Sequence, residues 1–381
     1  MHKVTFFPLD NADSILIEVN ADESAEKLIL FDYAHVRDAN NKDDKRCDLE
    51  KLLRDKLEAK ERDSFDVVAF SHLDDDHIHK ASEFFYFQYN TALQSETRFE
   101  IDELWVPAAV IVEDACEGDA AIIQKEARHR FKQAKGIRVF SQPKSLNDWM
   151  KKNKLSEETH GHLITDAGKP VPGWSDRKTK GVEFFVHSPF GFRQDDNEVV
   201  VRNDDCLVMQ ATFHTPGHLG GKDTRLILSA DVTHEIMSDI VKMTRKRNRE
   251  EKLKWDIFKL PHHCSYLSIG PEKGAEETVP VEDVKWWFEQ GTTGAKIIST
   301  SKIIPTQDTD QPPHRQAAKT HRNRAANMSG EFLVTMEEPD KAKPEPLVLK
   351  LDSFGVTVEK ASSGGATALL TTPPPRAGEK A

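Results

Sequence analysis

Alternating apolar and polar positions at the start of the chain predict three short strands. These stretches are residues 4–9, 14–19 and 27–33. Residues 11–13 (Asn-Ala-Asp) have turn chemistry, so the first two strands should be joined by a tight connection.

An amphipathic helix and a buried strand follow. Leucine recurs at helical spacing within residues 48–62, at positions 49, 52, 53 and 57. Residues 65–70 form a short apolar run typical of a strand covered on both faces. The polar residues that begin at Ser71 should therefore lie on a loop at the end of a strand.

The rest of the chain mixes strands with helices. The expected strands are residues 103–107, 136–140, 181–187, 206–213, 225–230, 256–260, 296–300, 331–336, 347–351 and 355–359. The expected helices are residues 120–134 and 281–290, and residues 154–177 should be loop. Residues 206–213 and 225–230 should pair as a hairpin around a Gly-rich turn. This order indicates two sheets, or one large mixed sheet, covered by helices.

The pattern suggests one domain over residues 1–361. We interpret residues 81–196 as an insertion and residues 331–359 as a C-terminal strand extension. Residues 362–381 are rich in Gly, Pro, Thr and Ala and are expected to be a disordered tail.

The composition is ordinary for a water-soluble protein, with 38% hydrophobic and 31% charged residues. No apolar run approaches the roughly 20 residues of a membrane helix, and the N-terminus has no signal-peptide cleavage site. The four cysteines are scattered without a Cys-x-x-Cys pair, which argues against a disulfide framework or a zinc ribbon. We therefore expect a cytoplasmic protein with no membrane contact.

The net charge of −11 argues against a dedicated nucleic-acid binder. Two stretches are locally basic, residues 244–249 (TRKRNR) and residues 313–324 (PHRQAAKTHRNR). The simpler interpretation is a solvated helix face or loop. The alternative is a rim that faces phosphate groups, and it gains weight only if a metal site lies nearby.

Residues 71–77, SHLDDDH, carry the clearest candidate chemistry. His72, Asp74, Asp76 and His77 place four potential ligands directly after a strand, where a loop lets side chains converge. Imidazole and carboxylate together suit a divalent ion. A helix N-cap is the alternative, but it explains one or two of the aspartates and not the histidines.

The segment resembles the His-x-His-x-Asp-His loop of the metallo-β-lactamase superfamily, with Asp74 in place of the second histidine. In this form, HxDxDH, it resembles the hydrolase domain of the bacterial competence DNA-uptake channel protein (ComEC-like). Other motifs of that family follow in order over residues 1–325. The matching segments of this chain, each with the family motif that it resembles in parentheses, are PLDNADSILIE ("DVGQGDSILI"), residues 30–33 ("IDxG"), 203–208 ("NxxSLV"), 226–231 ("LLTGD"), 259–265 ("KVPHHGS") and 297–314 (a strand and loop ending in "GHP"). The resemblance implies an αββα sandwich of two mixed sheets flanked by helices.

The resemblance also implies roles for these residues. His72 and Asp74 would face one metal ion, and Asp76 and His77 would face a second. The expected cofactor is therefore one or two divalent ions, zinc, manganese or magnesium.

Two further segments would complete the site. Asp231 would bridge or cap the ions, and one of His262 and His263 would close the site. We favour His263, because a His-x-Ser pattern follows the equivalent ligand in related nucleases. The alternatives are a strand-terminal turn residue for Asp231 and a core histidine beside Pro261 for the pair.

Several positions depart from the family pattern. The glycines that usually follow the HxDxDH loop are replaced by residues 78–81, Ile-His-Lys-Ala. The glycine of the family motif "PHHGS" is replaced by Cys264. We interpret Cys264 as a small packing residue, and the alternative is that it acts as a nucleophile. The "QGD" turn lacks both Gln and Gly. These changes indicate a divergent member.

Residues 214–218, HTPGH, look like the third ligand motif of the superfamily. About a dozen residues separate His218 from Asp231, which leaves no room for the strand that normally lies between them. We therefore expect a hairpin tip, with His218 as a ligand being the alternative. Losing this imidazole and gaining Asp74 would favour Mn²⁺ or Mg²⁺ over Zn²⁺ and leave one site weakly occupied.

The implied reaction is hydrolysis by a metal-activated water, with Asp76 or Asp231 holding the water and accepting its proton. The resemblance points to a phosphodiester in nucleic acid or a nucleotide, with His314 and Asn203 as substrate-binding residues. A loop histidine without a role is the alternative for His314. Two other functions remain open: hydrolysis of another ester or amide, and a non-catalytic binding protein that retains the fold. A protein partner is not identified by the sequence.

Overall fold

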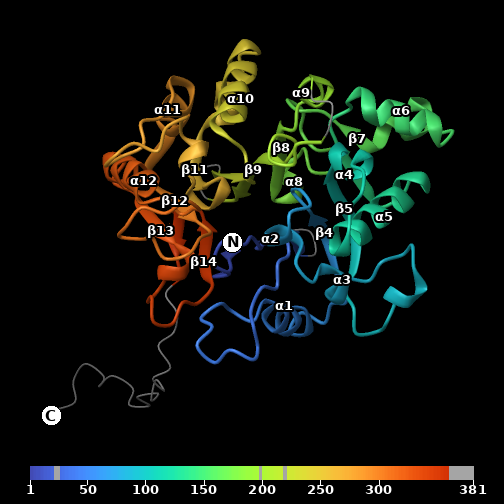
Figure 1. Cartoon of the computed structure of the whole chain (residues 1–381), viewed down its shortest axis with the longest axis horizontal. Coiled ribbons are helices and arrows are strands. Elements are labelled where there is room, and N and C mark those ends of the chain that lie inside the picture. The colour runs from blue at the N-terminus through green and yellow to red at the C-terminus, as the bar shows by residue number, and fades with distance from the viewer. Residues whose placement is uncertain (21–25, 197–199, 218–220, 360–381) are drawn as a thin grey trace, which may run out of the picture.

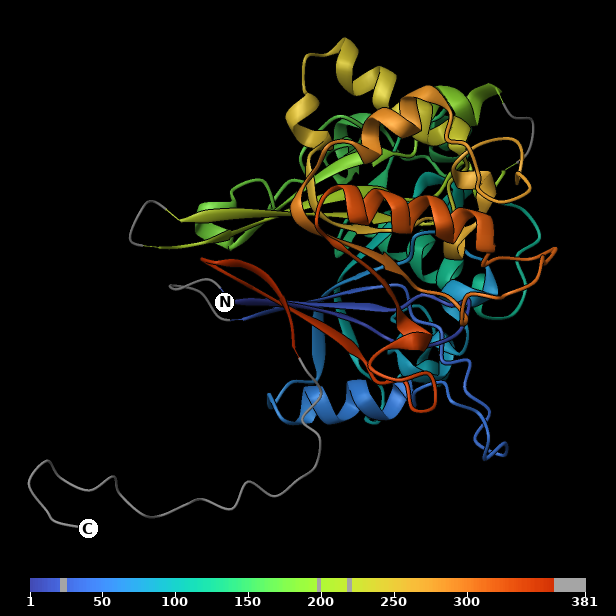
Figure 2. The same ribbon diagram turned by 90° about the vertical axis from the view of Figure 1, so that its left-hand side faces the viewer.

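In the computed structural model, two β-sheets pack face to face, with helices on both outer faces (Figure 1; Figure 2). The structure describes residues 1–20, 26–196, 200–217 and 221–359. The expected αββα sandwich of two mixed sheets is therefore confirmed. The tail expected at residues 362–381 lies outside the described residues.

Nine strands of the described residues form the first sheet, in the order β15-β14-β1-β2-β3-β4-β5-β6-β7. They are β1 His2–Phe6, β2 Ile15–Val19, β3 Lys27–Phe31, β4 Ser64–Ala69, β5 Glu100–Pro107, β6 Ile137–Phe140, β7 Ile164–Thr165, β14 Leu347–Asp352 and β15 Gly355–Val358. Strands β3 to β7 run parallel, whereas β15, β14, β1, β2 and β3 are successively antiparallel. Residues 81–196 therefore extend this sheet with three parallel strands.

Six strands of the described residues form the second sheet, in the order β13-β12-β11-β10-β9-β8. They are β8 Val182–Ser188, β9 Val208–Thr215, β10 Lys222–Ser229, β11 Trp255–Lys259, β12 Gly291–Ser299 and β13 Glu331–Val334. The predicted hairpin is present as β9 and β10, with Leu226 opposite Ala211. Strands β10 to β13 are parallel, so β10 and β11 end at the same edge.

Helices cover the outer face of each sheet. They are α1 Leu49–Glu58, α2 Asp75–Ile78, α3 Ala81–Phe84, α4 Ala108–Val112, α5 Gly118–Lys132, α6 Lys144–Lys152, α7 Glu157–His160, α8 Arg177–Lys180, α9 Gly191–Asp196, α10 His234–Lys246, α11 Glu282–Phe288 and α12 Arg315–Asn327. In α1, the Asp48 side chain caps the N-terminus by accepting from the Lys51 amide at 3.1 Å. The prediction of loop for residues 154–177 was wrong, because α7 and β7 lie there.

Three hydrophobic clusters account for the layers. One packs α1, α3 and α5 against the first sheet, for example through Leu53, Phe84 and Phe131. A second lies between the sheets, and a third packs α10, α11 and α12 on the second sheet. Among the residues that the structure describes, every helix is too short or too polar to span a bilayer.

Candidate metal centre

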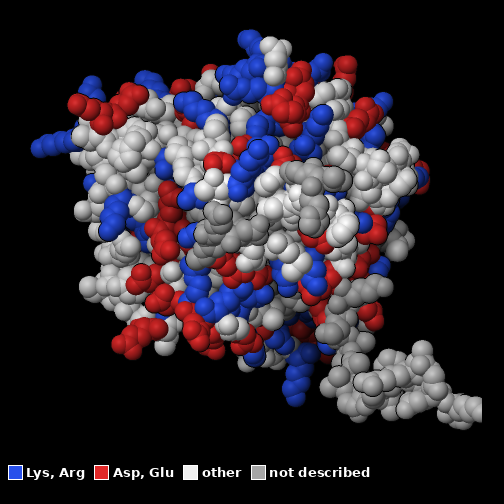
Figure 3. All heavy atoms as spheres, turned by 180° about the vertical axis from the view of Figure 1, so that it is seen from behind, with Lys and Arg blue, Asp and Glu red and all other residues white. Residues whose placement is uncertain are grey.

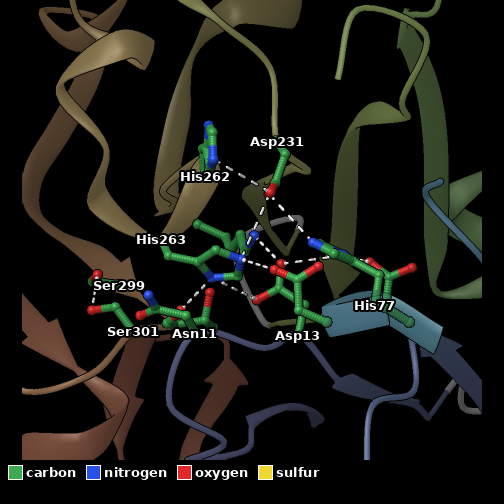
Figure 4. A network of polar contacts seen from close by, with 12 residues as sticks. Asn11, Asp13, His77, Asp231, His262, His263, Ser299 and Ser301 are labelled. Carbon is green, nitrogen blue, oxygen red and sulfur yellow. Dashed lines mark hydrogen bonds and ion pairs between the residues drawn. The ribbon is translucent and has the colours of Figure 1, made fainter. Parts of the chain in front are cut away.

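Four side chains meet where strands of both sheets end. They are Asp76, His77, Asp231 and His263. Each offers one ligand atom, and these atoms all lie within 4.8 Å of one another. Asp76 and His77 lie in α2 after β4, Asp231 follows β10, and His263 follows β11. In Figure 4, Asp231, His263 and His77 point toward a common centre.

Backbone hydrogen bonds hold the short helix α2 against the first sheet. The amide of Asp13 donates to the carbonyl of Asp76 at 2.9 Å, and the amide of Tyr33 donates to that of His77 at 3.0 Å. Asp74 occupies the N-cap position, but its side chain makes no capping hydrogen bond. Capping alone therefore does not account for the acidic run.

The loop after β11 has an unusual backbone. His262, His263 and Cys264 have φ values of 48°, 50° and 66°, in the left-handed region that favours glycine. Each such residue costs about 1–3 kcal/mol, so surrounding contacts must hold the loop in place. One of them is the His314 amide, which donates to the Cys264 carbonyl at 3.1 Å. This backbone turns the His263 side chain inward.

The histidines near the centre present free Nε2 atoms to it. Nδ1 of His263 donates to the carbonyl of Thr300 at 2.7 Å, and Nδ1 of His77 donates to Asp32 at 2.8 Å. A neutral imidazole with a protonated Nδ1 has its lone pair on Nε2. Among the described residues, these buried Nε2 atoms and Oδ1 of Asp231 form no hydrogen bond. Converging, unsatisfied N and O donors fit a divalent metal ion.

The electrostatics of the cluster also favour a cation. Burial would raise the pKa of Asp231, but His263 and His77 lower it well below its usual value. Burial would lower the pKa of His77, but Asp231 and Asp32 raise it well above its usual value. The carboxylates therefore stabilise positive charge at this point, either as a proton on His77 or as a bound ion.

A second layer of buried residues supports the ligands. Asp32 accepts from the Ser71 amide at 2.7 Å and from the Ser71 hydroxyl at 2.8 Å, as well as from His77. Asp13 pairs with the buried Lys259 ammonium, which also donates to the carbonyl of Ser229 at 2.9 Å. Asp13, Asp32 and His77 are close enough to form a second ligand group, but these partners already engage both carboxylates.

His72 and Asp74 lie beside the four-residue group and are not part of it. The His72 ring centroid is 4.1 Å from that of His77, and its Nε2 is 3.4 Å from Asp74. The other Asp74 oxygen accepts from Arg202 at 2.7 Å, and Arg202 also pairs with Glu113 at 2.7 Å. His72 and Asp74 could hold a second ion next to the first, as the sequence predicts, with Arg202 competing for the carboxylate.

The remaining predicted residues lie at the edge of the site or away from it. Nε2 of His262 is 3.9 Å from Asp231. His314 is buried; its Nδ1 accepts from the Tyr266 amide at 3.3 Å, and its Nε2 lies 3.4 Å from the Asp310 carbonyl. Asn203 is half-buried, and its carbonyl accepts from the thiol of Cys206 at 3.2 Å. Their roles in substrate binding remain predictions.

The HTPGH stretch lies at the connection between β9 and β10. His214 belongs to the end of β9, and its Nδ1 is 2.8 Å from Asp223. His218 lies outside the described residues. Strand β9 ends at Thr215 and β10 begins at Lys222, and the described residues between them form no further strand.

Sequence reasoning missed several residues that support the site. Asp13, Asp32 and Lys259 each occupy a position that the family motifs also contain, in "QGD", "IDxG" and "KVPHHGS". Those motifs therefore held a usable signal. Arg202 and Glu113 had none, because their contact with Asp74 depends on chain segments far apart in sequence.

Comparisons with known proteins add little to this description. No family model matches the chain, and no curated protein matches it. One solved structure, titled "Crystal Structure of a New Diphosphatase from the PhnP Family", is similar at a TM-score of 0.34 and 9% identity, over 94% of this chain and 100% of that chain. A similarity this weak supports no inference about function.

Replacing Asp32 by asparagine should weaken metal binding and leave the fold intact. The amide cannot supply the negative charge that orients His77, and loss of such a partner typically costs about 10–100-fold in metal affinity. Titration with Mn²⁺ against a competing chelator measures the effect. Asp75→Asn is the control, because Asp75 is exposed on α2, the helix that carries His77. Equal metal affinities of the Asp32→Asn and Asp75→Asn variants would contradict the role of Asp32.

Proposed function

We propose that this chain is a metal-dependent hydrolase of the metallo-β-lactamase superfamily, related to ComEC-like hydrolase domains, that cleaves phosphodiesters in nucleic acid or nucleotides. The observation that carries the proposal is the convergence of two imidazoles and two carboxylates from strand ends of both sheets. An intact ligand set of this kind argues against a non-catalytic binding protein.

A divalent ion held by Asp76, His77, Asp231 and His263 would polarise a phosphoryl oxygen and lower the pKa of a bound water toward about 7. The chain supplies the proton acceptor. Asp76 is the best candidate, because its side chain is 37% exposed while one oxygen lies 3.2 Å from Nε2 of His263. It therefore reaches both the ligand cluster and solvent. Asp231 is buried, which suits a ligand.

The phosphodiester substrate rests on the motifs shared with ComEC-like domains. The basic residues 313–324 give it little support, because most of the arginine and lysine side chains on α12 pair with acids. Arg315 contacts Asp308 at 2.6 Å, and Arg324 contacts Glu289 at 3.3 Å. These contacts favour the simpler interpretation of that stretch as a solvated helix face.

Hydrolysis of bis-p-nitrophenyl phosphate by metal-loaded protein tests the proposal. We expect turnover with Mn²⁺ or Mg²⁺, loss of turnover in EDTA, and recovery when the ion is restored. Absence of turnover with Mn²⁺, Mg²⁺ and Zn²⁺ on this diester and on DNA and RNA would contradict it. Metal analysis tests the ion preference separately, since two tightly bound Zn²⁺ per chain would contradict a preference for Mn²⁺ or Mg²⁺.

A further inference from the structure

A cavity of about 400 Å³ lies between β8, α9 and the C-terminal half of α10. Its volume falls in the range of small-molecule sites. None of the metal-centre residues lines it. Helix α10 begins near Asp231 and rises about 15 Å from His234 to Thr244, which lines the cavity. The cavity is therefore separate from the metal centre.

One wall of the cavity is aromatic. The rings of Phe190 and Phe192 lie 5.4 Å apart with an angle of 31° between their planes. Phe192 is 45% exposed, which is unusual for a phenylalanine, and Phe185 also lines the cavity. A flat, apolar ring entering the cavity would cover this exposed surface by stacking.

The rim of the cavity carries two arginines, Arg247 and Arg249, from the TRKRNR stretch. Within the described part of the chain, neither forms an ion pair with a carboxylate; they contact the carbonyls of Met243 and Gly168. Lys169, also on the rim, pairs with Asp166 at 2.9 Å. Figure 3 shows basic side chains gathered at the top of the molecule, where α10 projects in Figure 1. Exposed guanidinium groups without acidic partners suit a phosphate.

A buried histidine forms part of the cavity wall. His187 lines the cavity, is 2% exposed, and has Nε2 at 3.0 Å from the carbonyl of Lys252. The carbonyl accepts, so Nε2 carries the hydrogen and Nδ1 is an acceptor. Burial lowers the pKa of His187 to about 3, which keeps the ring neutral. Among the described residues Nδ1 has no hydrogen-bond partner and is itself buried, so the neutral ring contributes a wall of the cavity.

We propose that this cavity binds a mononucleotide, with its base on Phe190 and Phe192 and its phosphate at Arg247 and Arg249. A nucleotide combines the flat ring and the anion that the aromatic wall and the two arginines would recognise. The site does not depend on the proposed hydrolase activity, because it shares no residue with the metal centre.

Isothermal titration of the EDTA-treated full chain with adenosine 5′-monophosphate (AMP) tests the proposal. We expect AMP to bind at least tenfold more tightly than adenosine or ribose 5-phosphate, each of which lacks one recognised group. Arg247→Glu and Phe192→Ala should each weaken AMP binding at least tenfold. Lys246→Glu is the matched control, because this exposed lysine precedes Arg247 and does not line the cavity.

Two results would overturn the proposal. One is the absence of AMP binding at millimolar concentration. The other is AMP binding that Arg247→Glu and Phe192→Ala leave unchanged; if Asp76→Ala then abolishes this binding, the nucleotide lies at the metal centre instead. Arg247→Glu should also leave diester turnover unchanged, so failure of this site and failure of the hydrolase proposal give different results.

Discussion

Replacing His77 by alanine should remove metal binding and diester hydrolysis together. Its Nε2 lies 3.3 Å from Asp231 and faces the centre of the ligand group, while its Nδ1 is fixed by Asp32. Loss of the ion removes several kcal/mol of charge stabilisation, which corresponds to a fall of about 10³-fold or more in kcat/KM. Metal analysis and turnover of bis-p-nitrophenyl phosphate, measured on the same purified sample, check both effects.

Because His77 is fully buried, its replacement could also disturb folding. Asp76→Ala avoids this problem, since Asp76 is partly exposed, and it should show the same loss of turnover with an unchanged circular dichroism spectrum. His79→Ala is the control: His79 lies just after α2, and its side chain pairs with the exposed Asp75 at 3.0 Å. Full turnover in folded Asp76→Ala protein would refute the assigned centre.

The layered fold was predictable because each strand carries its own pattern. The alternation in β1 and β2 and the apolar run of β4 mark these strands without any knowledge of their partners. The order of strands was not predictable from that pattern. The three strands β5, β6 and β7 join the first sheet through contacts between distant segments. Helices α10 and α12 were not predicted, because each has many polar residues and only a short row of apolar ones.

The candidate ligands were predictable to the extent that they are local. Residues 72–77 are close in sequence, so their proximity in space required no long-range information. Which of His262 and His263 turns inward is decided by three left-handed residues and could be chosen only by analogy. The structure places His263 in the four-residue group and His262 beside it.

The family motifs contain the second-layer residues Asp13, Asp32 and Lys259, but their contacts were beyond sequence reasoning. Asp13 and Lys259 are 246 positions apart, so nothing in either local sequence shows that they pair. The pairing of a carboxylate and an ammonium that are both almost fully buried emerges only when the sheets pack face to face. This pair lies next to the candidate ligands, because Asp13 is also 3.8 Å from His77 and 4.0 Å from His263.

Replacing Lys259 by methionine should therefore destabilise the protein by about 3–5 kcal/mol, the usual cost of leaving one partner of a buried ion pair uncompensated. Urea unfolding in the presence of EDTA measures the change without the stabilising effect of bound metal. Adding Asp13→Asn to Lys259→Met should recover much of the loss, because the buried charge is then removed. Lys254→Met, at an exposed lysine just before β11, should change stability little. If Lys259→Met were no more costly than Lys254→Met, the buried pair would not hold the two sheets together beneath the metal centre.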